Sequence, residues 1–220
     1  AEGSLRSFTW RWNDDIVIYA SDVPASGIVG SAWTRTARTD AANGVAIWNQ
    51  DSGVEKIASP AATPVSYVDV PFYAAAGVPY RLWMRMRADG DAWWNDSVFL
   101  QFSGRVTAQG APMHRIGTTS AARVSLEEGT GAGLSGWGWN DEAYGAIADP
   151  IYFATSGPQT IRIQQREDGV MWDQIVISAA TYRANAPGAT KNDVTIVPGS
   201  VGTSQAGVAS HTYSGAGQFP

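Results

Sequence analysis

The chain has 220 residues, of which only 16% are charged, and its formal net charge is −5. Because nucleic acids bind basic surfaces, this acidic balance argues against a nucleic-acid-binding protein. The sequence contains no cysteine, which excludes disulfide bonds, thiol catalysis and cysteine-ligated zinc. The sequence contains no run of 18 apolar residues, so it does not predict a transmembrane helix.

Short apolar runs with strand-like alternation follow one another along the chain. In "YRLWMRMR" (80–87), Leu82, Met84 and Met86 fall on one face and the arginines on the other. The other predicted strands cover residues 15–20, 66–74, 97–103, 122–126, 150–154, 159–165 and 172–178. Asp168-Gly169 predicts a hairpin turn between the last two.

These elements are separated by turn residues and lack βαβ alternation. They predict an all-β fold, an antiparallel β-sandwich or jelly roll of about eight to ten strands. We expect one domain over residues 1–184. We expect the domain to end near residues 184–197 and take residues 185–220 as a C-terminal extension or linker, because the tail from Val201 onward loses apolar periodicity and is rich in Gly, Ser and Ala.

Trp-Asn-Asp occurs at 12–14, 94–96 and 139–141. A structural interpretation is that a strand ends on a large apolar side chain and Asn-Asp then turns the chain. We favour that interpretation for 12–14. A functional interpretation is a sugar site, because an indole packs on the apolar face of a pyranose while amides and carboxylates bind its hydroxyls.

Two of the copies lie in glycine-containing segments that predict long loops. Residues 88–97 carry two adjacent tryptophans that cannot both enter the core from a regular strand. Residues 133–145 carry three further aromatic residues, Trp137, Trp139 and Tyr144. Aromatic side chains on loops are typical of a binding surface. The candidate carbohydrate-binding residues are Trp93, Trp94, Asn95, Asp96, Trp137, Trp139, Asn140, Asp141 and Tyr144.

Carboxylates offer two other interpretations. Paired carboxylates hydrolyse glycosides, and Asp96, Asp141, Glu142 and Glu167 are available, although no spacing marks two of them as a pair. Calcium prefers oxygen ligands, and Asp22 and Asp173 flank the first and last strong strands, so they are the candidate metal ligands. Turn and cap roles for the same aspartates remain open.

Three segments carry a resemblance to a known family: "DIVIYASDV", "YRLWMRMRA" with "NDSVFLQFSG", and "QTIRIQQREDGVMWDQIVIS". Over residues 8–184 the chain resembles galactose-binding-like jelly rolls, specifically carbohydrate-binding modules of family 6, family 35 and the malectin-like kind. The resemblance implies non-catalytic polysaccharide binding by loop aromatics and a structural calcium between the first and last strands. Asp173 matches the recurrent aspartate of the closing strand, and Asp22 is what "YASD" (19–22) retains of a Glu-rich family motif.

We therefore expect an exported bacterial module, its signal peptide removed, that binds polysaccharide without cleaving it. The alternative is a structural or adhesive extracellular subunit, such as a filament or surface-layer component, whose aromatic termini pack on neighbouring copies. The termini contribute Phe8, Trp10, Tyr213 and Phe219 to that alternative. A third possibility is a glycoside hydrolase or lyase, which needs two carboxylates facing each other in a cleft.

Overall fold

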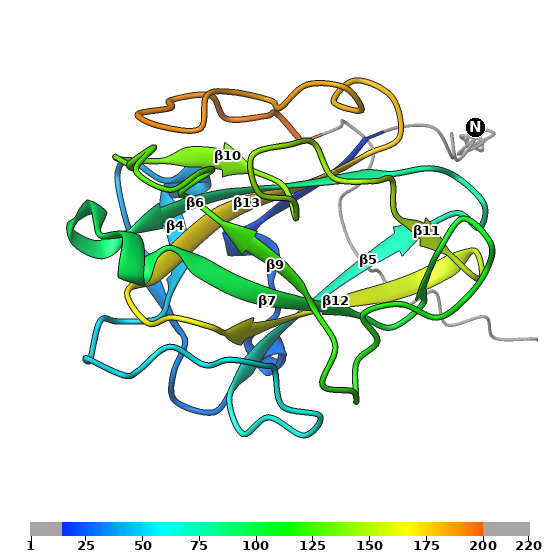
Figure 1. The fold of residues 1–220 in the computed structure, drawn as a ribbon, viewed down its shortest axis with the longest axis horizontal. Coiled ribbons are helices and arrows are strands. Elements are labelled where there is room, and N and C mark those ends of the chain that lie inside the picture. Colours follow the sequence, from blue (N-terminus) through cyan, green and yellow to red (C-terminus); the bar gives the residue numbers. More distant parts are fainter. Residues whose placement is uncertain (1–14, 200–220) are drawn as a thin grey trace, which may run out of the picture.

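The computed structural model describes residues 15–199, which form two antiparallel sheets packed face to face (Figure 1). Sheet A has the order β10, β6, β13, β4, β3, and β1 pairs with β13 beside β4. Its strands are β1 (Ile16–Tyr19), β3 (Thr34–Ala37), β4 (Val45–Trp48), β6 (Arg81–Ala88), β10 (Gly138–Asn140) and β13 (Val170–Ser178).

Sheet B has the order β2, β5, β12, β7, β9. Its strands are β2 (Ile28–Val29), β5 (Tyr67–Ala74), β7 (Ser97–Phe102), β9 (Ala122–Ser125) and β12 (Gly157–Gln165), and a separate ladder joins β8 (Arg105–Val106) to β11 (Tyr152–Phe153). The chain changes sheet between β5 and β6, β6 and β7, and β12 and β13. This order confirms the predicted all-β antiparallel sandwich with jelly-roll connections.

All eight strands predicted from alternation are present, and the turn at Asp168-Gly169 joins the last two. The predicted hairpin is wrong, however, because β12 belongs to sheet B and β13 to sheet A. The prediction also missed β2, β3, β4, β8 and β10, which have two to four residues each. Such short strands show no measurable period and form because longer neighbours offer them backbone partners.

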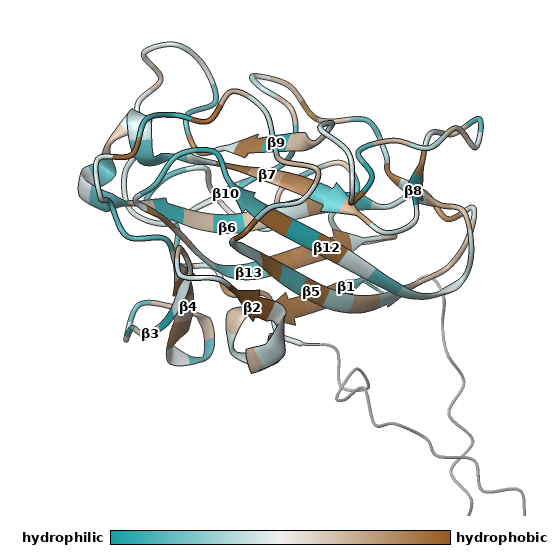
Figure 2. Ribbon diagram, turned by 90° about the horizontal axis from the view of Figure 1, so that it is seen from below, coloured by the Kyte–Doolittle hydropathy of each residue, from teal (hydrophilic) through white to brown (hydrophobic). Residues whose placement is uncertain are grey.

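The core lies between the two sheets. Leu82, Met84 and Met86 of β6 point inward and are at most 2% exposed. They meet apolar side chains of β5 and β12 such as Val70 and Ile161. Figure 2 shows the alternation of apolar and hydrophilic residues along β5 and β12 that produces this one-sided packing. Each such side chain contributes on the order of 2 kcal/mol through burial.

A β-bulge in β13 directs two polar side chains to the outer face of sheet A. The register shifts between Trp172, paired with Met86, and Gln174, paired with Arg85, which leaves Asp173 as the extra residue. Trp172 remains in the central core, while Asp173 and Gln174 both contact groups on the other side of the sheet. A bulge re-aims side chains in this way.

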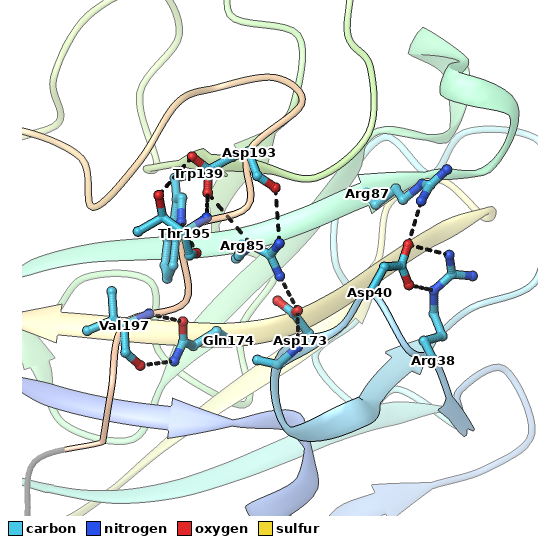
Figure 3. Close-up of polar contacts among 11 residues, drawn as sticks. Arg38, Asp40, Arg85, Arg87, Trp139, Asp173, Gln174, Asp193, Thr195 and Val197 are labelled. Atoms are coloured by element: carbon cyan, nitrogen blue, oxygen red, sulfur yellow. Dashed lines mark hydrogen bonds and ion pairs between the residues drawn. The ribbon is translucent and has the colours of Figure 1, made fainter.

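Residues 185–199 cover the outer face of sheet A, as the orange segment of Figure 1 shows. The Gln174 amide exchanges two hydrogen bonds with the Val197 backbone, and Trp139 Nε1 donates to the Thr195 carbonyl over 3.1 Å (Figure 3). Gly138 permits the approach, since a Cβ there would lie 2.0 Å from the Thr190 carbonyl oxygen. The result is a second apolar cluster, composed of Val17, Trp83, Trp139, Val176 and Val197.

The predicted domain boundary therefore shifts. Residues 185–199, assigned to an extension or linker from composition, are part of the packed domain. Composition did not reveal this packing, because residues 185–199 form no strand and only Asp193 and Val197 among them are buried. The rest of the predicted extension, residues 200–220, and the first Trp-Asn-Asp copy at 12–14 lie outside the described residues.

A buried ion pair fixes this face. Arg85, which is 1% exposed, donates to the Asp173 carboxylate and to the Asp193 carbonyl (Figure 3). Asp173 also accepts a 2.7 Å hydrogen bond from the Ala42 amide. Burial raises the pKa of Asp173 to about 6, although Arg85 acts in the opposite direction.

We predict that Arg85→Met lowers the free energy of unfolding by about 3–5 kcal/mol at pH 7, because it leaves the buried Asp173 carboxylate without its cation. The double variant Arg85→Met/Asp173→Asn removes that charge and recovers part of the loss. Urea unfolding of both proteins measures the difference. A double variant no more stable than Arg85→Met contradicts the prediction.

We predict that a chain ending at Ala184 is less stable than one ending at Gly199. The shorter chain loses the hydrogen bonds of Gln174 and Trp139 to the 185–199 segment, each worth roughly 1 kcal/mol, and exposes the apolar cluster beneath. Thermal unfolding of the two chains measures the effect. Equal midpoints would mean that the segment adds no stability.

Candidate functional site

The loop between β6 and β7 carries the largest exposed aromatic pair of the described chain. It contains two 3₁₀ turns, Asp89–Asp91 and Trp93–Asn95. Trp93 and Trp94 are 58% and 56% exposed, with ring centroids 5.4 Å apart and planes at 84°. The 3₁₀ turn explains this exposure, because it directs consecutive side chains away from the strand register.

Hydrogen bonds to neighbouring segments hold this loop in place. Trp48 Nε1 donates to Asp89 over 2.8 Å, and the Gly136 amide donates to Asp91 over 2.9 Å. The Asn95 side chain, 2% exposed, donates to Asp51 Oδ2 over 2.9 Å. The two tryptophans therefore stand on a backbone that is anchored to both neighbouring loops.

A first hollow of about 390 Å³ opens beside the two tryptophans. Its opposite wall is the 51–56 segment, which folds around the Asp168 carboxylate: the Ser52 and Val54 amides donate to Asp168 Oδ2 over 2.7 and 2.9 Å. Lining residues include Asp51, Glu55, Lys56, Asn95, Glu167 and Asp168. Hydrogen-bonding groups thus surround an aromatic wall, the arrangement that a sugar ring requires.

A second hollow of about 260 Å³ adjoins the first. Both are lined by Trp93, Lys56 and Glu167, and the second adds Asp96, Arg123, Tyr144 and Arg166 among others. Tyr144 is 46% exposed, and the Arg123 guanidinium lies 5.6 Å from the centre of its ring. Trp93 therefore separates two hollows, each with an exposed aromatic group of its own.

Asp96 and Glu167 form a carboxyl pair that lines the second hollow. Each is at most 4% exposed. Glu167 accepts hydrogen bonds from Ser97 Oγ and the Asp96 amide, while Asp96 Oδ2 accepts one from the Glu127 amide. Burial, together with the neighbouring Glu167 side chain, raises the pKa of Asp96 to about 7. A buried proton on Asp96 relieves the repulsion between the two groups.

The structure corrects the placement of Trp137 and Trp139. Trp139 belongs to β10 and is 0% exposed, and Trp137, 4% exposed, packs under the Arg85 guanidinium at 4.8 Å. Neither ring reaches solvent, so neither can stack on a ligand in this structure. The predicted loop is wrong here because β6 offers a free edge to residues 138–140.

Asn140 and Asp141 are also buried, at 1% and 3% exposed. Asp141 accepts backbone hydrogen bonds from Ala143 and Ala148 and contacts Arg81, so its carboxylate organises the following loop. Of the nine predicted carbohydrate-binding residues, the structure brings Trp93, Trp94, Asn95, Asp96 and Tyr144 to the two hollows.

Eleven residues that line the hollows lie outside the nine predicted ones, among them Asp51, Glu55, Lys56, Arg123, Arg166, Glu167 and Asp168. Of these, the sequence indicates only Glu167, as a candidate carboxylate. The eleven residues come from three separate segments, 51–56, 123–127 and 166–168. Arg166 to Asp168 follow β12 in the sequence, and a turn signal there indicated an exposed tip but not the edge at which it lies. The polar run "NQDSGVEK" at 49–56 carries no signal beyond that of an ordinary loop.

The residues expected to hold calcium do not fit that role. Asp22 is exposed, whereas the Asp173 carboxylate is buried and already neutralised by Arg85. Within residues 15–199 no group of three or more His, Asp or Glu side chains is arranged to hold a metal ion. Arg85 supplies the positive charge that a cation would bring to this aspartate.

The carboxylates are also not arranged as in a glycoside hydrolase. Asp96 and Glu167 are in direct side-chain contact, whereas glycosidases hold two carboxyl groups roughly 5 Å or more apart. Glu142 is bound by the Arg105 guanidinium, and Asp141 by backbone amides. The same described residues include no helix long and apolar enough to span a membrane.

No protein-family model and no curated protein sequence matches the chain. Solved structures do resemble it. A β-(1,4)-mannanase with a family 35 carbohydrate-binding module from Podospora anserina matches 78% of this chain at 10% identity, with a TM-score of 0.48. The match spans 29% of that enzyme's chain.

Two isolated modules match over nearly their whole length. The C-terminal family 6 module of the laminarinase LamC from Zobellia galactanivorans has 10% identity and a TM-score of 0.44 over 75% of this chain and 99% of its own. A family 36 module in complex with calcium and xylotriose has 15% identity and a TM-score of 0.40 over 74% and 98%. These likenesses are of fold and identify no ligand for this protein.

We predict that Asp96→Asn changes the pH dependence of stability. With a pKa near 7 in the folded protein and near 3.8 when unfolded, Asp96 lowers stability progressively as pH rises from about 4 to 7. Asparagine keeps the side-chain shape, accepts from the Glu127 amide and lacks this titration. The free energy of unfolding of the variant minus that of the wild type is therefore expected to be larger at pH 8 than at pH 4. Urea unfolding of both proteins at both pH values measures this difference. The same change in unfolding free energy between pH 4 and pH 8 for the two proteins would refute the raised pKa of Asp96.

Proposed function

We propose that this chain is a non-catalytic module that binds polysaccharide in the two hollows on either side of Trp93. The observation that carries the proposal is the pair of tryptophans at 93 and 94, both more than half exposed on an anchored loop and bordered by amides and carboxylates. Exposed indoles in a polar concave site offer a sugar both a stacking surface and hydrogen-bond partners.

The perpendicular arrangement of the rings also indicates how a glycan would lie. Two rings at 84° present no common plane, so they cannot both lie flat on a sheet-like crystalline surface. Together with Tyr144 beyond Trp93, they suit successive units of a single chain that bends across the loop. We therefore propose a soluble chain or a chain end as the ligand. We also propose an extracellular location for the module, where such polysaccharides are found.

Names of the structural neighbours are in keeping with this proposal, since they include carbohydrate-binding modules solved with xylotriose and with cellobiose. The proposal does not include calcium, because Asp22 and Asp173 do not fit a calcium site. The alternative of an extracellular structural subunit depends on the two termini, which lie outside residues 15–199.

The proposal is tested with Trp93→Ala and Trp94→Ala. Each change removes one stacking surface, and we expect a roughly tenfold loss of affinity for whichever glycan an array identifies, measured by titration calorimetry. Tyr73→Ala is the matched control, because Tyr73 is an aromatic residue of β5, 51% exposed, and lines neither hollow. Binding that survives both tryptophan changes, or an array without any bound glycan, would refute the proposed function.

A further inference from the structure

The first hollow carries a surplus of hydrogen-bond acceptors and negative charge. Its lining includes the carboxylates of Asp51, Glu55, Glu167 and Asp168, opposed by the single ammonium group of Lys56. Glu167 is paired with Lys56 Nζ at 3.8 Å and with the Arg166 guanidinium at 3.0 Å, so both cations are directed to that residue. Asp51, Glu55 and Asp168 have no ion pair with any residue in the described part of the chain.

The partners of these carboxylates position them without neutralising them. Asp168 accepts from two backbone amides, and Asp51 accepts from the Gly53 amide and from Asn95. Neutral donors bring no positive charge, so these carboxylates keep their negative charge beside the hollow. Glu55 is exposed, and its carboxylate forms no hydrogen bond or ion pair with another residue of the 15–199 range.

Asn95 gives independent evidence that the first hollow binds a hydrogen-bond donor. It lines the first hollow, it is 2% exposed, and its Oδ1 is buried without a hydrogen-bond partner in residues 15–199. Gly169, with φ +75°, leaves room for this amide: a Cβ there would lie 2.4 Å from Asn95 Cγ. A buried acceptor without a donor is costly, so a ligand that brings a donor gains by binding beside it.

The aromatic wall is compatible with a cation as well. A cation is attracted to the face of an indole by the ring quadrupole, and Trp93 and Trp94 are both more than half exposed beside the hollow. The net charge of −5 adds a long-range attraction of the same sign.

We propose that the first hollow selects a sugar unit that carries a free ammonium group, so that the ligand is a glycan containing unacetylated amino sugars. This inference rests on the proposed function, which it narrows to one class of polysaccharide. The ammonium group donates to the carboxylates of the 51–55 wall while the ring stacks on Trp94. A uronic acid unit is repelled by the same carboxylates, and an N-acetylated unit brings no charge.

The test compares three oligosaccharides of equal length, built from glucosamine, N-acetylglucosamine and glucose. At pH 5.5 and low salt the glucosamine oligomer is expected to bind roughly three- to tenfold more tightly than the other two. Added salt shrinks that difference, because the charged groups are at the surface. Glu55→Gln removes one unpaired charge and is expected to reduce the preference, whereas Glu55→Lys is expected to abolish it.

Asp149→Asn is the matched control, because Asp149 is an exposed carboxylate that lines neither hollow. An equal effect of Asp149→Asn and Glu55→Gln would show that the preference is only non-specific attraction to an acidic protein and would overturn the inference. Equal binding of all three oligomers would overturn it too, but would leave the proposed function intact. If neither these oligomers nor any glycan of the array binds, both fail together.

Discussion

The buried ion pair of Arg85 and Asp173 is the interaction on which most of this structure depends. It joins β6 to the bulge of β13, and through the Ala42 amide and the Asp193 carbonyl it also fixes the turn before β4 and the 185–199 segment. Separating this buried ion pair is strongly unfavourable, because either charge would then be left unpaired away from water. Four segments that are distant in sequence are thus held at one point.

This arrangement also decides where a ligand can bind. One face of sheet A packs on the core, and residues 185–199 cover part of the other, which buries Trp139. Trp137 is buried on the same outer face against Ala46 and Met171. The loop that carries Trp93 and Trp94 stays accessible at the edge of the sandwich, where it lies beside the β12–β13 connection. The buried amide of Asn95 links these loops, so the exposed aromatic groups stand on a rigid support.

The two hollows differ in charge although they share Trp93. Carboxylates dominate the first, whereas Arg123 and Arg166 enter the lining of the second and burial there raises the pKa of Asp96. A glycan that spans both would meet different chemistry at successive units. Selectivity can then arise from charge and hydrogen bonding, while each stacked ring adds only a modest part of the affinity.

The sequence by itself determined the sandwich, its long strands and the inward face of β6, because alternation over eight residues fixes which side chains face the space between the sheets. It also identified Trp93 and Trp94 as loop residues, since adjacent tryptophans cannot share one face of a strand. Only the tertiary structure decided the fate of Trp137 and Trp139, which carry the same local motif. Whether Trp-Asn-Asp becomes a surface or a core depends on whether a free strand edge and a covering segment lie nearby, and those partners come from residues far away in the chain.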